Sequence, residues 1–210
     1  MNKYIVELVG TFFFVFTIGM TVLTPGIGAF APLAIGTALA VMVYAGGHVS
    51  GGHYNPAVTL AVWIRGKCRA VDVPAYWVAQ LAGAGLAAYA ALYLKGFPTV
   101  EAGTPDVLPS LLAEFLFTFA LVWVVLNTAT APANAGNSHY GLAIGATVMV
   151  GAYAVGGISG GAFNPAVAVG ITVMGLSSVA NLWIFLVANF AAGLVAAILY
   201  KAVVKDVAPA

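Results

Sequence analysis

The sequence predicts an all-α membrane protein in which six spanning helices and two half-membrane, re-entrant helices form an inverted 3+3 internal repeat. Three observations lead to this prediction. The chain of 210 residues is 62% apolar and only 6% charged, with a mean hydropathy of +1.04, whereas a soluble domain carries roughly 25% charged residues. Several of its apolar runs are long enough to cross a bilayer. Two distant stretches also repeat each other. The lipid bilayer is therefore the expected surrounding of this chain.

Six apolar segments have the length that a spanning helix needs, about 20 residues. They contain Gly and Ala throughout, rather than the short alternating segments of about ten residues that mark a membrane β-barrel. The six lie at roughly 4–24, 30–48, 73–94, 108–130, 139–157 and 178–201. Two further apolar pieces, at about 55–64 and 164–174, are too short to cross. We expect these pieces to enter the membrane and stop inside it.

The basic residues predict which side each loop occupies, because Lys and Arg are enriched in cytoplasmic loops. With both termini in the cytoplasm, all but one of the basic residues fall on that side: Lys3, Arg65, Lys67, Arg69, Lys201 and Lys205. Lys95 falls outside, in a loop that also holds Glu101 and Asp106. We therefore expect a multi-pass protein of the cell (plasma or inner) membrane with cytoplasmic termini. A net charge of +1 gives no basic field for nucleic acid.

The two halves of the chain repeat each other. Residues 48–58 read HVSGGHYNPAV, and residues 157–167, 109 positions later, read GISGGAFNPAV. Each half, about 1–100 and about 108–205, holds three spans and one short piece. Because three is odd, the second half starts on the opposite side of the membrane, so residues 1–210 form one domain with an inverted repeat. In such folds, interrupted apolar segments at matching positions indicate the transport pathway.

Each short piece begins with Asn-Pro-Ala, which reads as a helix start. The motifs are Asn55, Pro56, Ala57 and Asn164, Pro165, Ala166. Asn is a preferred N-cap, and Pro fits the first helical position because its missing N–H would be unpaired there. The preceding Ser-Gly-Gly reads as extended, flexible chain, which is tolerated at membrane depth only against protein or a water-filled cavity. One copy alone is most often an ordinary capped helix. Two copies at matching positions predict two half-helices that meet in mid-membrane and line a pore.

Two carboxylates and two histidines complete the candidate residues. Glu7 and Glu114 lie within predicted spans at matching positions, and an ionisable group there indicates a functional site. We expect both to support the loops before the half-helices, with proton relay or pore lining as the alternative. For His48 and His53, loop support is favoured over pH gating. The residue types beside them give no metal site, and nothing in the sequence indicates a cofactor. Cys68 lies in a polar run and reads as a free surface thiol.

These motifs resemble those of the major intrinsic protein family, the aquaporins and aquaglyceroporins, over essentially the whole chain. The resemblance is carried by Glu7 with Gly10-Thr11, HVSGGHYNPAVT at 48–59, Glu114, and GGISGGAFNPAV at 156–167. It implies one pore per subunit, usually in a homotetramer, for water and small neutral solutes. It also implies that Asn55 and Asn164 donate N–H groups to a passing water. Backbone carbonyls would continue the polar line, at Gly52, His53 and Tyr54 and at Gly160, Gly161 and Ala162.

The chain departs from this family at the outer constriction. Most members have Arg directly after the second Asn-Pro-Ala, and this chain has Val167. Counting from the motifs, the other constriction positions are Ile35, Ala152 and Gly161, where water-selective members usually have Phe, His and a small residue. The glycerol-channel subgroup usually has Asp where this chain has Ala168. We therefore expect a wider, uncharged constriction that admits glycerol, urea, ammonia or hydrogen peroxide, with half-helix dipoles and desolvation still excluding ions.

Other classes of protein fit less well. A secondary transporter also uses inverted repeats and broken helices, but it needs coupling groups, and loop support already accounts for Glu7 and Glu114. A junction protein on the same scaffold would favour longer loops and tails. No nucleophile–base pair or metal cluster indicates an enzyme. The sequence therefore favours a passive channel, with an inverted-repeat secondary transporter of a small solute as the alternative.

Overall fold

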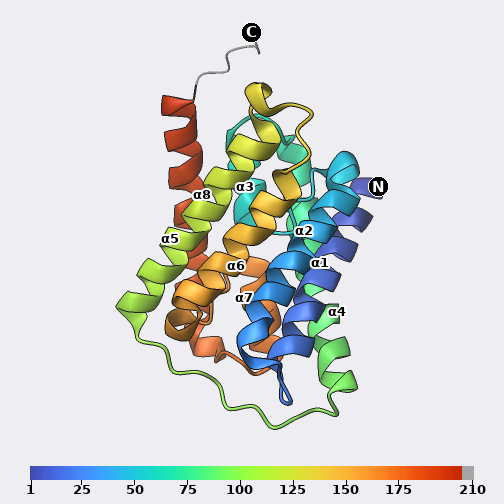
Figure 1. Ribbon diagram of the computed structural model, residues 1–210, viewed down its shortest axis with the longest axis vertical. Coiled ribbons are helices and arrows are strands. Elements are labelled where there is room, and N and C mark those ends of the chain that lie inside the picture. The colour runs from blue at the N-terminus through green and yellow to red at the C-terminus, as the bar shows by residue number, and fades with distance from the viewer. Residues whose placement is uncertain (205–210) are drawn as a thin grey trace.

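The computed structural model describes residues 1–204, and Lys205, one of the basic residues predicted to be cytoplasmic, lies outside that range. Within it, six helices are long and apolar enough to cross a membrane. They are α1 (Asn2–Val22), α2 (Ala31–Ser50), α4 (Val73–Leu94), α5 (Val107–Val125), α6 (Tyr140–Ser159) and α8 (Leu182–Val203), with the shorter α3 (Pro56–Ile64) and α7 (Pro165–Val173) between them (Figure 1). The predicted all-helical fold class is confirmed. The helix bounds agree with the predicted spans to within a few residues.

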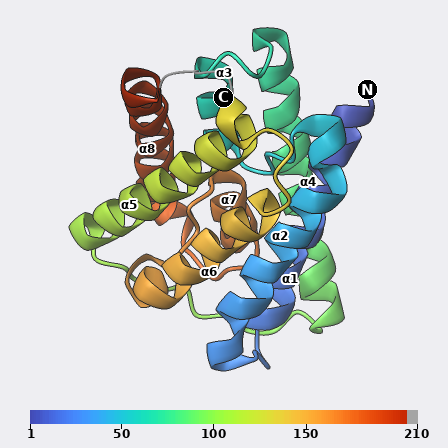
Figure 2. The ribbon, with the colours of Figure 1, turned by 45° about the horizontal axis from the view of Figure 1, so that its top comes forward.

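The two short helices occupy opposite halves of the bundle. In Figure 1, α3 lies in the upper half, on the side where α1 begins and α8 ends, and α7 lies in the lower half. Figure 2 shows the same separation after rotation. The segment between α4 and α5, residues 95–106, crosses the lower end. We call these the α3 end and the α7 end of the molecule. This placement fits the inverted arrangement that the repeat predicts.

Small residues let the long helices approach closely. A Cβ added to Gly36 of α2 would lie 2.6 Å from the carbonyl oxygen of Gly145 in α6, and one on Gly83 of α4 would lie 2.5 Å from that of Leu8 in α1. Membrane helices associate mainly through such close packing, because lipid tails are as apolar as the side chains. These contacts join α1 to α4 and α2 to α6. They therefore fix the frame in which the short helices sit.

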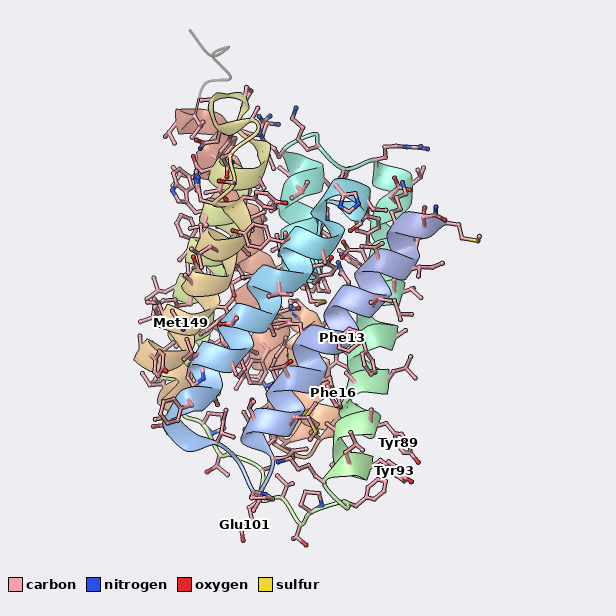
Figure 3. The ribbon with its side chains drawn as sticks, turned by 45° about the vertical axis from the view of Figure 1, so that its right-hand side comes forward. Phe13, Phe16, Tyr89, Tyr93, Glu101 and Met149 are labelled. Atoms are coloured by element: carbon pink, nitrogen blue, oxygen red, sulfur yellow. The ribbon has the colours of Figure 1, made fainter. Side chains whose placement is uncertain are left out.

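The outer surface of the bundle is apolar, as a surface facing lipid should be. Phe13 of α1 and Val150 of α6 are 47% and 54% exposed. Tyr89 and Tyr93 project from α4 toward the α7 end, the end that also carries Glu101 (Figure 3). Aromatic rings with a polar tip are enriched where a membrane meets water. The exterior therefore agrees with a multi-pass membrane protein.

The Ser-Gly-Gly segments differ from the extended chain that we expected. Ser50 is the last residue of α2, and Gly51 follows as its C-cap with φ of 91°. In the second half, Ser159 ends α6 and Gly160 has φ of 94°. This left-handed conformation favours Gly, because any side chain would strain it. The glycines therefore end each helix abruptly and turn the chain back into the bundle.

Candidate functional site

The two asparagines cap the short helices and brace each other's loops. The Asn55 side-chain oxygen accepts a hydrogen bond from the N–H of Ala57 at 2.9 Å, and that of Asn164 accepts from Ala166 at 2.8 Å. Their amide nitrogens reach across the molecule. Asn55 Nδ2 donates to the Phe163 carbonyl oxygen at 2.9 Å, and Asn164 Nδ2 donates to that of Tyr54 at 2.8 Å. The N-termini of α3 and α7 are thus tied together at the centre.

Each of these amides has one N–H donor that does not take part in the hydrogen bonds between the loops. An amide group has two N–H donors, and the cross-brace uses one from each side chain. Asn55 and Asn164 both line a small central cavity. Tyr54 and Phe163, just before the motifs, adopt the left-handed conformation with φ of 48°. The tight turns aim both asparagines at the same space, where the remaining N–H groups can meet a small molecule.

Glu7 holds the loop before α3. One carboxylate oxygen accepts from Ser50 Oγ at 2.7 Å and from the His53 N–H at 2.9 Å. The other accepts from the Tyr54 N–H at 2.7 Å and from Gln80 Nε2 at 2.8 Å. Glu7 is fully buried. A buried charge is tolerated when hydrogen bonds satisfy its oxygens, and here they also fix the loop backbone.

Glu114 holds the loop before α7 in the same way. Its oxygens accept from Ser159 Oγ at 2.7 Å, from the Ala162 N–H at 2.9 Å and from the Phe163 N–H at 2.7 Å. It too is fully buried. The geometry agrees with the loop-supporting role that we expected of both carboxylates. Neither Glu7 nor Glu114 lines the central cavity or the larger ones beside it.

A polar network at the α3 end surrounds His53. The Thr59 hydroxyl lies 3.1 Å from the Asn55 carbonyl oxygen and accepts a hydrogen bond from Gln80 Nε2 at 3.0 Å. It also lies 3.1 Å from His53 Nδ1, and either group can be the donor of that hydrogen bond. The His53 ring packs against Tyr76 at 5.1 Å between centroids.

His48 does not support the loop. It lies in the last turn of α2 with an exposed side chain, and its ring makes no hydrogen bond within residues 1–204. It lines a cavity beside Lys67 and the segment from Thr128 to Asn137. Helical spacing explains the difference, because Ser50, two residues later, faces the interior and supplies the hydroxyl that bonds Glu7. The expectation for His48 was therefore wrong in the structure.

Three cavities follow one another through the bundle. The α7-side cavity has a volume of about 350 Å³ and includes Val167 and Ile171 of α7 in its wall. The central cavity measures only about 10 Å³ and lies between the two asparagines. The α3-side cavity measures about 330 Å³ and opens among Ser50, His53 and Val62. His53 lines the last two, and Ala162 lines the first two, so each cavity adjoins the next.

The four residues predicted for the outer constriction meet in one place. Ile35, Ala152, Gly161 and Val167 all line the α7-side cavity. No Asp, Glu, Lys or Arg is among the described residues that line it. The structure therefore brings all four residues to the same cavity, whose volume is about 350 Å³.

The predicted carbonyl positions divide between the cavities. Gly52, His53 and Ala162 line the central cavity, and Gly160 and Gly161 line the α7-side cavity. Tyr54 differs, because it lines none of these three cavities and its carbonyl accepts from Asn164. Its carbonyl oxygen therefore takes part in the hydrogen bonds that join the two loops.

Sequence reasoning missed Gln80, Thr59 and the pair of Thr118 with Asn189. Thr118 Oγ1 donates to Asn189 Oδ1 at 2.8 Å, and all four side chains are fully buried. A signal was present, because Gln80 and Asn189 are polar residues inside apolar spans and lie 109 positions apart. Applying the repeat offset to every polar residue would have found them.

The α3 end carries several basic residues and the cysteine. Lys3, Lys67 and Arg69 line the α3-side cavity, and Lys3 pairs with Asp72 at 2.5 Å. Cys68 is free and half-buried, rather than fully on the surface, and burial raises the pKa of its thiol. Within residues 1–204, no group of three His, Cys, Asp or Glu side chains could hold a metal ion.

Comparison with known proteins gives consistent results. The sequence pattern of the family described as Major intrinsic protein matches residues 1–200. Aquaporin NIP1-3 of Oryza sativa subsp. japonica is 40% identical over 197 residues, which cover 88% of this chain and 68% of the relative. Glycerol uptake facilitator protein-like 6 of Lactiplantibacillus plantarum is 34% identical over 213 residues, covering 94% and 95%.

A solved structure shows the same fold. The aquaglyceroporin of Plasmodium falciparum superposes with a TM-score of 0.79 at 22% identity, covering 97% of this chain and 96% of that one. At this identity the likeness concerns the fold. The matching family pattern, the relatives and the paired Asn-Pro-Ala caps point the same way. The chain therefore belongs to the major intrinsic protein family and is a passive membrane channel for water and small solutes.

Proposed function

We propose that the channel runs through the three adjoining cavities and conducts water and small neutral solutes. The candidate solutes are glycerol, urea, ammonia and hydrogen peroxide, and ions and protons are excluded. One observation carries this proposal: the cavities follow one another through the bundle, and the two helix-capping asparagines line the central one. The Asn-Pro-Ala residues 55–57 and 164–166 are then the centre of the pore. Ile35, Ala152, Gly161 and Val167 form its outer part.

Proton exclusion follows from the arrangement at the centre. The helix N-termini of α3 and α7 carry partial positive charge, and each asparagine has one N–H beyond the cross-brace. A water that accepts both N–H groups directs its hydrogens away from the centre. It therefore cannot pass a proton between its neighbours. The carbonyls at Gly52, His53, Gly160, Gly161 and Ala162 offer acceptors on either side.

Ion exclusion does not require the missing arginine. The described residues that line the α7-side and central cavities include no Asp, Glu, Lys or Arg. An ion that leaves water for such a passage loses most of its solvation, which costs far more than moving a neutral molecule. Because Val167 stands where most family members have Arg, this part of the passage has no fixed charge to select among solutes. The cost of desolvation still opposes the entry of ions.

The membrane arrangement is also part of the proposal. Lys3, Lys67 and Arg69 gather at the α3 end, which the enrichment of basic residues in cytoplasmic loops makes the cytoplasmic end. Both termini are then cytoplasmic, and the α7 end faces outward. Residues 1–210 form one channel domain with repeats of about 1–100 and 108–205. We further propose a homotetramer in the cell membrane with one pore per subunit.

Stopped-flow light scattering on proteoliposomes tests the proposed function. Water flux is measured with an impermeant osmolyte, and glycerol and urea flux with gradients of each solute. An internal probe measures hydrogen peroxide, and each measurement is repeated with an imposed proton or sodium gradient. We expect a water flux that is higher than in protein-free liposomes, and water and solute fluxes that are not driven by the ion gradients. Solute flux that depends on an ion gradient would favour the secondary transporter and overturn the proposal.

A further inference from the structure

Of the three cavities along the passage, the central one has by far the smallest volume. The α7-side cavity, at about 350 Å³, surrounds all four positions where this family usually has its outer constriction. The central cavity measures about 10 Å³, and a cavity needs at least about 10–15 Å³ to hold a single water. The described structure therefore allows about one water molecule at a time between the asparagines, and much more on either side.

Large apolar side chains form the wall of this narrow part. Phe14 of α1, Leu39 of α2, Leu121 of α5 and Val148 of α6 all line the central cavity. They form two related pairs, because Phe14 and Leu121 share the 107-residue offset of the glutamates, and Leu39 and Val148 share the 109-residue offset of the motifs. We call these four residues the central ring. Each comes from a different long helix.

The central ring is fixed in place. Its side chains are between 2% and 4% exposed and belong to the packed core. Interiors packed at this density do not make room for a larger molecule without displacing neighbours. Phe14 and Val148 also line the α7-side cavity, so they form the neck between the wide and narrow parts. A solute that enters from the α7 end meets this neck first.

We infer that the central ring, and in particular Phe14 and Val148, is the size filter of the channel. This inference rests on the proposed function and names the solutes that the filter favours. Molecules of about one water in cross-section, such as hydrogen peroxide and ammonia, pass along the asparagines. Glycerol and urea are wider, so they enter the α7-side cavity and are slowed at the neck. Selection by size therefore lies about mid-membrane, and the outer four residues contribute little to it.

Matched pairs of variants test the filter in proteoliposomes. Phe14→Ala and Val148→Ala widen the central ring. Phe13→Ala and Val150→Ala are their controls, because these residues lie nearby on the same helices and are 47% and 54% exposed. Val167→Ala enlarges the cavity that is already wide. The readouts are water, hydrogen peroxide and glycerol permeability, with size-exclusion profiles to verify folding.

The inference predicts a wild-type channel that passes hydrogen peroxide well and glycerol slowly. The glycerol-to-water permeability ratio should rise about tenfold in Phe14→Ala and Val148→Ala, the size of effect expected when a close-fitting apolar site loses methylene groups. It should stay within about twofold of wild type in Phe13→Ala, Val150→Ala and Val167→Ala. If Phe14→Ala does not fold, Val148→Ala, which removes only two methyl groups, decides the question.

Two results would overturn the inference while leaving the proposed function intact. One is a ratio that rises in Val167→Ala and is unchanged in the folded central variants. The other is a wild-type protein that conducts glycerol as fast as hydrogen peroxide. A wild-type protein without water flux above protein-free liposomes would instead remove the proposed function, and this inference with it.

Discussion

The loops before α3 and α7 share a scaffold but differ in what they present to the passage. Glu7 and Glu114 each bind a serine hydroxyl and two successive backbone N–H groups. Tyr54 and Phe163 have the same left-handed φ of 48° and accept from the opposite asparagine. These hydrogen bonds of the scaffold are thus repeated in both halves.

The residues around the two loops differ. His53 and Thr59 in the first half correspond to Ala162 and Ala168 in the second, with the same offset of 109. The α3 half therefore has a polar network joined by Gln80, whereas the α7 half has alanine at the positions of His53 and Thr59. The comparison teaches that loop geometry has to be kept in both halves, because the two asparagines must meet. The chemistry of each mouth is free to change independently.

The largest expected effect comes from removing the carboxylates that both halves share. Glu7→Ala leaves four donors in the buried network without their acceptor, and each buried unsatisfied group costs about 1–3 kcal/mol. Glu114→Ala leaves three. We expect only a small fraction of either variant to be folded, and a smaller fraction of Glu7→Ala than of Glu114→Ala. Thermal unfolding in detergent followed by size exclusion measures this, and Glu101→Ala, in the exposed loop, is the control. Equal stability of the Glu7 variant and wild type would contradict the account.

The next largest effect is expected when a charged residue is introduced into the apolar α7-side cavity. Val167→Arg places a fixed cation in the wall of the wide cavity, where it narrows the space and adds polar donors. We expect the permeability of the larger solutes to fall by about tenfold or more, an increase in barrier of about 1.4 kcal/mol, with a smaller loss for water. Val167→Met supplies length without charge as the control. Unchanged permeability of hydrogen peroxide, urea and water alike in a folded Val167→Arg protein would show that this cavity is not on the route.

A smaller effect is expected when Gln80 is replaced by Asn, the residue type at the matching position 189 of the second half. Gln80→Asn shortens the side chain by one methylene and withdraws its nitrogen from Glu7 and Thr59. Losing these bonds should lower the free energy of unfolding by about 1–3 kcal/mol, seen as a lower melting temperature. Gln80→Glu, which keeps the length but offers no N–H to Glu7, should destabilise more. A Gln80→Asn protein as stable as wild type would show that the network is dispensable.

The smallest effect concerns the surface of the α3 end. Lys3 pairs with Asp72 at 2.5 Å, and its side chain is 29% exposed. A partly exposed ion pair contributes about 0–1 kcal/mol, so Lys3→Ala should change the melting temperature only slightly and leave water flux unaltered. The same measurements on Lys67→Ala provide the reference for a basic residue that has no ion pair among residues 1–204. A large loss of stability in Lys3→Ala alone would mean that this pair anchors α1.

Most of the fold was predictable because lipid imposes simple rules on a sequence. A spanning helix must be apolar over about 20 residues, so the limits of the spans could be read directly. The caps at Asn55 and Asn164 were equally readable, since their bonding is local. The positions of Ile35 and Ala152 followed because the helices that carry them run without a break to the loops.

The remaining features depend on contacts between distant segments. Nothing local to Asn55 indicates that its nitrogen bonds Phe163, 108 positions away. His48 was assigned to the wrong face, since a helix turns about 100° per residue and small shifts in its end change which side chain points inward. The width of the passage at Val167, compared with Phe14, depends on how four helices pack. Side-chain identity alone does not provide that information.

The most direct test of the proposed route is to block the passage without changing the outer surface of the protein. Val148→Trp fills the neck beside the central cavity, and Val150→Trp places the same ring on the exposed face of α6. With both proteins folded in proteoliposomes, we predict that stopped-flow water permeability falls to the level of protein-free liposomes in Val148→Trp and stays near wild type in Val150→Trp. Full water permeability in a folded Val148→Trp protein would contradict the account, because water would then be crossing by another route.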